Sequence, residues 1–160
     1  MREARLDLKN FITVINYRST YWSVDPASIV AVDPKKRGSR TIARGPLIKL
    51  QAVQALLRSG RFDADQLWLA TNKCLKDLQK ESWSVSDVRL MLQGLDGAAD
   101  YYKSEWCEVL GGRWLPCDVY RTPYDAQGKR RHAKGLLVYI KFSIEVDATL
   151  TIALVSCHAA

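Results

Sequence analysis

The chain has 160 residues, of which 48% are hydrophobic and 26% charged, a balance typical of a globular domain that can bury a core. This composition argues against a disordered, collagen-like or coiled-coil protein, and the length fits one domain or one domain with a structured extension. No apolar stretch reaches the roughly 18–20 residues that a transmembrane helix needs, and the first residues lack the apolar core of a signal peptide. We therefore expect a cytoplasmic protein with no membrane partner.

Positive charge is concentrated in two segments of the chain. The formal net charge is +7. Segments 33–58 and 113–141 each contain seven basic residues and have net charges of +6 and +5, whereas segment 59–112 has a net charge of −3. Clustered positive charge indicates a surface that faces a polyanion, although ordinary solubilising charge would give the same totals.

The cysteines and histidines do not form a metal-binding motif. The sequence contains no C-x-x-C pair, and no two cysteines have the short spacing of a zinc knuckle. We therefore expect reduced, packed cysteines, no metal site and no cofactor. The residues concerned are Cys74, Cys107, Cys117, Cys157, His132 and His158.

Residues 1–45 are predicted to form an N-terminal extension. Two runs rich in β-branched residues, 11–15 and 28–32, favour short strands. The basic run 33–39 is typical of a loop or linker. We place a domain boundary near Gly45-Pro46 and expect the extension to pack on the domain that follows it, residues 46–160.

Three helices are expected next, over residues 46–58, 63–78 and 84–94. Proline suits the first turn of the first helix, and capping boxes mark the starts of the other two. Their apolar residues recur every three to four positions, as in helices that pack on a core. The capping boxes pair Asp63 with Gln66 and Ser84 with Asp87; the apolar stripes are Leu50, Val53 and Leu57, then Leu67, Ala70, Cys74, Leu75 and Leu78, then Val85, Val88, Leu92 and Leu95.

The last third of the chain is predicted to form four strands, 101–110, 114–121, 136–144 and 149–157. Short connections between them favour antiparallel pairing. Because the helices precede the strands, we expect an α+β fold in which helices pack on one face of an antiparallel sheet.

The strand at 136–144 predicts which side chains point away from the helices. Val138, Ile140 and Phe142 alternate with Tyr139 and Lys141. The apolar set belongs under the helices, so Tyr139 and Lys141 should project from the uncovered face, about 7 Å apart. A basic, aromatic sheet face can bind RNA, although an ordinary solvated face would show the same alternation.

Five motifs occur in an order that resembles a known family. They are the segment that begins Pro46-Leu-Ile-Lys-Leu, the helix end at 90–95, Asp100-Tyr-Tyr-Lys-Ser104, Asp118-Val-Tyr-Arg121 and Val138-Tyr-Ile-Lys-Phe142. Over residues 46–158 the series resembles the MqsR toxins of bacterial toxin–antitoxin systems, within the RelE-like ribonuclease group. The resemblance implies a RelE/MqsR-like fold, metal-independent cleavage of mRNA and a cognate antitoxin protein as partner.

The resemblance also implies site residues. It places Lys103 and Tyr139 at functional positions of the family, with Lys141 beside Tyr139 and His158 where the family has a lysine. Cys117 stands where the family has a functional glutamine. We therefore predict four catalytic residues. We also predict a set of RNA-binding residues, which includes a basic run, 129–131, in a connection that is longer than in the family. The catalytic set is Lys103, Tyr139, Lys141 and His158; the RNA-binding set is Tyr102, Tyr120, Arg121, Lys129, Arg130 and Arg131.

These residues can support transesterification, in which a ribose 2′-hydroxyl attacks the adjacent phosphate and leaves a 2′,3′-cyclic phosphate and a 5′-hydroxyl. The reaction needs a base, positive charge for the phosphorane and an acid for the leaving oxygen. Lysine and arginine supply the charge, while Tyr139 and His158 can exchange protons. Two alternatives stay open: a non-catalytic RNA-binding module on the same fold, and a domain whose basic surface binds an acidic protein.

Overall fold

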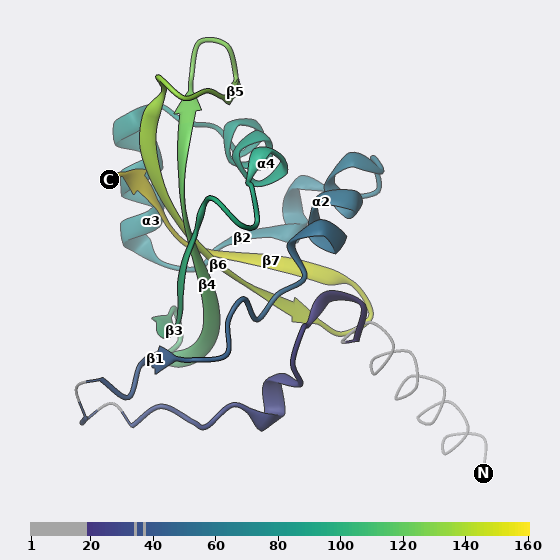
Figure 1. Ribbon diagram of the computed structural model, residues 1–160, viewed down its shortest axis with the longest axis vertical. Coiled ribbons are helices and arrows are strands. Elements are labelled where there is room, and N and C mark those ends of the chain that lie inside the picture. The colour runs from purple at the N-terminus through teal and green to yellow at the C-terminus, as the bar shows by residue number, and fades with distance from the viewer. Residues whose placement is uncertain (1–18, 34, 37) are drawn as a thin grey trace.

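A computed structural model describes residues 19–33, 35–36 and 38–160 (Figure 1). Within that part of the chain, a mixed sheet of seven strands packs against α-helices, so the predicted α+β class is confirmed. The helical elements are η1 (Pro26–Ser28), α2 (Leu50–Arg58), η2 (Ala64–Gln66), α3 (Asn72–Glu81) and α4 (Val85–Gly94). The strands are β1 (Thr41–Ile42), β2 (Leu67–Leu69), β3 (Tyr101–Val109), β4 (Arg113–Asp125), β5 (Arg130–Arg131), β6 (Leu136–Val146) and β7 (Leu150–Ala159).

The four predicted strands correspond to β3, β4, β6 and β7, which lie side by side and antiparallel. The full strand order is β1-β3-β4-β6-β7-β2, with β5 paired to β4. The three short strands β1, β2 and β5 were not predicted. Because β2 runs parallel to β7, the sheet is mixed rather than purely antiparallel.

The second predicted helix is divided in two. The Asp63 N–H donates to Gln66 Oε1 at 2.8 Å, but this capping box closes only the short turn η2. The chain then pairs with β7 as β2, and Thr71 caps α3 by accepting a hydrogen bond from the Cys74 N–H. Leu75 lies outside the buried Cys74–Leu78 stripe of α3 and is exposed, contrary to prediction.

The first helix begins at Leu50 rather than Pro46, because the preceding segment is held in another conformation. The N–H groups of Leu47 and Ile48 both donate to the buried carboxylate of Asp118, at 3.0 and 2.9 Å. Gly45 precedes this contact, and a Cβ there would collide with the Tyr101 hydroxyl and the Ser104 hydroxyl. The motif at 45–48 is therefore a docking segment and not a helix start.

The third helix begins at its predicted capping box. The Asp87 N–H donates to Ser84 Oγ, and Asp87 Oδ2 accepts from the Ser84 N–H at 2.9 Å. Val88 and Leu92 of α4 are buried as expected. Val85, the first residue of the helix, is 39% exposed, contrary to its predicted place in the buried stripe.

The described part of the extension packs on the domain without forming the predicted strand at 28–32. That segment contains the end of η1 and then extended chain, and its Ile29 N–H bonds to the Pro26 carbonyl instead of to a neighbouring strand. Ile29 and Trp22 are nevertheless buried in the main core, and β1 extends the sheet beside β3. The predicted strand at 11–15 lies outside the described residues.

Side chains from α2, α3 and α4 join one core with the apolar side chains of β6. Val138, Ile140 and Phe142 are fully buried there, which confirms the predicted alternation of this strand. We call the opposite side of the sheet the open face. Tyr139 and Lys141 lie on it, and both are partly exposed.

The open face is closed at one end by the curvature of the sheet. The Leu110 N–H, just after β3, donates to the carbonyl of Ala70, just after β2, although these strands lie near opposite ends of the strand order. A second small core fills this end, and Ser143 is buried beside it with its hydroxyl donating to the Pro116 carbonyl. The expected uncovered face is thus open only over part of its length. The second core consists of Ala70, Cys107, Val109, Cys117, Ala153 and Val155.

Candidate nucleic-acid interface

Six of the ten predicted site residues meet on the open face. Arg121 of β4 lies opposite Tyr139 of β6, which in turn lies opposite His158 of β7. Lys103 and Lys141 flank Val119 from the two sides of β4. Strand register therefore brings together residues that are up to 56 positions apart in the chain. We call this set the cationic–aromatic cluster: Tyr102, Lys103, Arg121, Tyr139, Lys141 and His158.

The rings of Tyr139 and His158 are stacked, with centroids 5.0 Å apart and an interplanar angle of 17°. His158 Nδ1 lies 2.8 Å from the Ala159 carbonyl oxygen. A carbonyl oxygen can only accept, so Nδ1 carries the proton, and Nε2 of the neutral ring keeps its lone pair. The geometry thus leaves Nε2 able to take a proton from a bound molecule.

Tyr102 and Arg121 form an exposed planar surface. The Arg121 guanidinium carbon lies 3.8 Å from the Tyr102 ring centroid, a cation–π contact. An irregularity in the β3–β4 pairing falls between Tyr101 and Lys103, at Tyr102, and the Tyr102 side chain is 47% exposed. Aromatic rings and guanidinium planes of this kind are the surfaces on which unpaired bases stack.

The two lysines of the cluster share one carboxylate, Glu105 of β3. Its oxygens lie 2.7 Å from Lys141 Nζ and 3.1 Å from Lys103 Nζ. Burial by itself raises the pKa of Glu105, but the hydrogen bonds and charges of the lysines outweigh it and hold this pKa below its usual range. Sequence reasoning missed Glu105; its spacing of two from Lys103, on the same side of a predicted strand, was the available signal.

Lys141 is the more enclosed of the two lysines. Burial by itself lowers its pKa, but the hydrogen bond and charge of Glu105, together with Cys107 in its deprotonated form, outweigh burial, and the pKa lies above its usual range. The Lys141 ammonium also lies 5.7 Å from the Tyr139 ring centroid. It therefore supplies a positive charge beside the Tyr139 ring.

Asp118 supports the cluster from the other side of the sheet. Its carboxylate accepts hydrogen bonds from the two backbone N–H groups of segment 45–48 described above. It also accepts one from the Ser104 hydroxyl, at 2.6 Å. Since that hydroxyl proton is used, Tyr101 donates to Ser104 Oγ, at 2.7 Å. Burial raises the pKa of Asp118. Sequence reasoning missed this role, because it depends on contact with a segment 70 residues away in the chain.

Four predicted RNA-binding residues lie elsewhere. Tyr120 is only 1% exposed and stacks on Phe142 within the core, so it offers no surface to RNA, contrary to prediction. The other three lie in β5 or just before it, and β5 is next to α4 (Figure 1). Lys129 pairs with Asp87 at 3.0 Å, Arg131 pairs with Asp100 at 2.8 Å, and Arg130 is exposed on β5.

Cys117, which the resemblance to the MqsR toxins aligns with a functional glutamine, is fully buried in the second core. Burial raises the pKa of its thiol well above the usual range. All four cysteines are free and buried. Cys117 therefore presents no side chain at the surface where RNA would lie.

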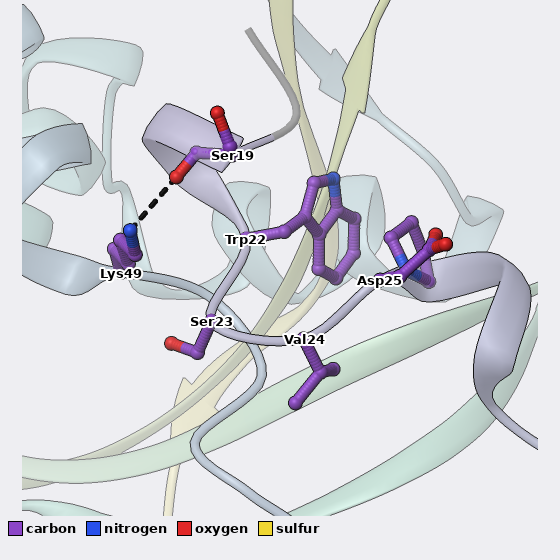
Figure 2. A pocket seen from close by; sticks show the side chains of 7 residues that line it. Ser19, Trp22, Ser23, Val24, Asp25 and Lys49 are labelled. Carbon is purple, nitrogen blue, oxygen red and sulfur yellow. Dashed lines mark hydrogen bonds between the residues drawn. The ribbon is translucent and has the colours of Figure 1, made fainter. Parts of the chain in front are cut away.

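A separate cavity of about 440 Å³ lies where residues 19–26 meet Lys49 (Figure 2). Trp22 forms one wall, and the Lys49 ammonium donates to the Ser19 carbonyl oxygen at 2.7 Å. No residue of the cationic–aromatic cluster lines this cavity. It therefore adds nothing to the cluster as a candidate site.

No family model, curated protein or solved structure matches this chain. The resemblance to the MqsR toxins thus rests on the sequence motifs alone. Over residues 19–160, apart from positions 34 and 37, no group of His, Cys, Asp and Glu side chains is arranged to hold a metal ion. In the same part of the chain, no helix is long and apolar enough to cross a bilayer.

Proposed function

We propose that the protein is the toxin of a type II toxin–antitoxin system, a metal-independent endoribonuclease that cleaves mRNA by 2′-hydroxyl transesterification. The observation that carries the proposal is the Tyr139–His158 stack, opposite Arg121 on an open, positively charged sheet face. This arrangement joins groups that exchange protons to groups that stabilise a phosphorane, as the reaction requires. The order of the MqsR-like motifs supports it.

Each group of the cluster has a role in this scheme. His158 Nε2 takes the proton from the 2′-hydroxyl as the oxygen attacks phosphorus. Tyr139 donates its proton to the 5′-oxygen as the P–O5′ bond breaks, and solvent then restores the protonation of both rings. Arg121, Lys103 and Lys141 stabilise the charge of the phosphorane. A nucleobase next to the cleaved bond stacks on the exposed surface of Tyr102 and Arg121.

The proposed partners are mRNA and a cognate antitoxin protein. The positive open face is suited to a polyanion, because phosphate contacts release counterions and strengthen binding at low salt. Neutralisation by an antitoxin follows from the resemblance. Cleavage of mRNA inhibits translation and so arrests growth.

The decisive experiment incubates the purified chain with a long mRNA in EDTA and analyses the ends of the products. We expect cleavage that yields 2′,3′-cyclic phosphate and 5′-hydroxyl ends. His158→Ala should abolish most of it, while His132→Ala, a change in the exposed β5–β6 loop, should leave it intact. Activity that requires a divalent metal, or products with 5′-phosphate ends, would refute the mechanism.

A non-catalytic RNA-binding module is the second candidate, and the burial of Cys117 favours it. At this position the family presents a functional amide, whereas here the thiol is enclosed in the second core. RNA binding that depends steeply on salt, without cleavage under any tested condition, would identify this alternative.

A further inference from the structure

Glu105 is an acidic residue that contacts both lysines of the cationic–aromatic cluster. Its carboxylate is divided between two lysines: Oε1 lies 2.7 Å from Lys141 Nζ, and Oε2 lies 3.1 Å from Lys103 Nζ. Lys103 lies two residues from Glu105 on the same strand, β3, whereas Lys141 comes from β6, so its ion pair with Glu105 spans the intervening β4. One carboxylate thus fixes the separation of two ammonium groups that would otherwise repel each other.

Lys103, Glu105 and Lys141, which together we call the Glu105 bridge, differ in exposure to solvent. The side chains of Lys141 and Glu105 are 16% and 17% exposed, while that of Lys103 is 41% exposed. An enclosed ammonium needs a counterion, so Lys141 depends on Glu105. Lys103 lies at the rim, where it can turn from the carboxylate to a phosphate without losing contact with water. A phosphate that approaches the open face therefore meets Lys103 before Lys141.

We propose that Glu105 is a positioning residue of the ribonuclease site, whose carboxylate holds Lys141 in the floor of the open face and directs Lys103 toward the phosphate of bound RNA. This inference rests on the proposed function. Both carboxylate oxygens are occupied by ammonium groups, so Glu105 acts through the lysines and not on the reacting atoms.

The surroundings of Lys141 predict how the site responds when the Glu105 charge is removed. The titratable groups that face it are Glu105 and Cys107 of β3, Cys117 of β4 and Tyr139 of its own strand; Ser156 lies opposite it on β7. Without the Glu105 carboxylate, less negative charge opposes the lowering of the Lys141 pKa by burial. The positive charge of nearby Lys103 lowers this pKa further. Lys141 then loses its proton at a lower pH.

The test compares Glu105→Gln with Glu108→Gln in the full chain. Glu108 is the matched control because it lies on the same strand, is exposed and is outside the cluster. Cleavage of a long mRNA is measured from pH 6 to pH 10 for kcat and KM, together with RNA affinity and thermal unfolding.

For Glu105→Gln we expect kcat to fall by about 10- to 100-fold, the cost of small misplacements of charged groups. KM should stay level or fall, since a negative charge has left the RNA-binding face. The alkaline limb of the pH–rate profile should move to lower pH, because the Lys141 pKa falls when the carboxylate is removed. Glu105→Asp keeps the charge but is too short to reach both lysines, so it should lower kcat while the alkaline limb stays nearer that of wild type.

Three results would overturn the inference while the wild-type protein cleaves RNA. The first is an unchanged kcat and pH profile in Glu105→Gln. The second is faster cleavage, which would mean that the carboxylate competes with phosphate. The third is a loss of thermal stability with equal losses in kcat/KM and affinity and no change in the pH profile, which would indicate a purely structural role. If wild type itself fails to cleave, the proposed function fails first and the inference with it.

Discussion

Ser104 and Glu105 are adjacent on β3 and lie on opposite faces of the sheet. Each face contains one partly or fully buried carboxylate, Asp118 on the helix side and Glu105 on the open face, and the two are stabilised by different kinds of donor. On the helix side, Asp118 accepts hydrogen bonds from neutral donors, two backbone N–H groups and the Ser104 hydroxyl, and burial raises its pKa. On the open face, Glu105 is held by two ammonium groups that lower its pKa against the effect of burial. Neutral, buried donors fix the backbone, while partly exposed ion pairs leave charges that a ligand can use.

The largest expected effect is on stability, from loss of Asp118. Asp118→Ala leaves the N–H groups of Leu47 and Ile48 and the Ser104 hydroxyl without a buried acceptor. Each unsatisfied group costs about 1–3 kcal/mol, so the free energy of unfolding should fall by roughly 3 kcal/mol or more. Urea unfolding measures it, with the exposed Asp65→Ala as control. A loss under about 1 kcal/mol would show that segment 45–48 docks by other contacts.

The next effect is on catalysis and should leave stability unchanged. Tyr139→Phe removes only a hydroxyl and keeps the ring stacked on His158. If the hydroxyl gives a proton in the transition state, cleavage should slow by roughly 10²-fold or more, with little change in RNA affinity. Single-turnover cleavage and equilibrium binding on the same RNA provide the measurement. A stable variant with wild-type cleavage would remove Tyr139 from the proposed chemistry.

Asp118 and Tyr139 also show how much of the fold and of the candidate site the sequence predicts. The side of β6 on which Tyr139 lies was predictable, because apolar residues recur at every second position from Val138 to Ile144. The role of Asp118 was not, because it depends on a segment 70 residues away. The same limit applies to half of the Glu105 bridge: its pair with Lys103 lies within β3, but its pair with Lys141 depends on the register of β3, β4 and β6.

Local spacing gave a wrong prediction where the same spacing of apolar residues is compatible with both a helix and a strand. Leu67, Ala70 and Cys74 suit a helix, but Leu67 pairs with Ile152 in the sheet and only Cys74 is helical. The basic run at 129–131 suggested RNA binding from charge alone. The structure instead pairs Lys129 and Arg131 with carboxylates beside the end of the sheet, which sequence proximity could not show.

Acid should weaken the fold through Asp87, a smaller effect than either of those above. Burial by itself raises the pKa of Asp87, but hydrogen bonds from Ser84, Lys129 and Tyr124 outweigh it and hold the pKa below its usual range. The unfolded chain therefore takes up this proton at a higher pH than the folded chain, so stability is lost as pH falls below about 4. Urea midpoints from pH 6 to pH 3 should fall less for Asp87→Asn than for wild type. Equal pH slopes in the two proteins would contradict this linkage.

The smallest expected effect separates the roles of the two lysines on the open face. Lys103→Ala removes the more exposed ammonium of the Glu105 bridge, while Lys141 keeps its own ion pair with Glu105. Cleavage should fall more than RNA affinity, because a charge aimed at the phosphorane is worth more in the transition state than in the ground state. The slope of log affinity against log salt should decrease by at most about one, since one phosphate contact is lost. Lys134→Ala, in the exposed loop before β6, is the matched control and should change neither quantity. An equal loss of binding and cleavage would mean that Lys103 only attracts RNA, and that the charge which stabilises the phosphorane comes from Arg121 and Lys141.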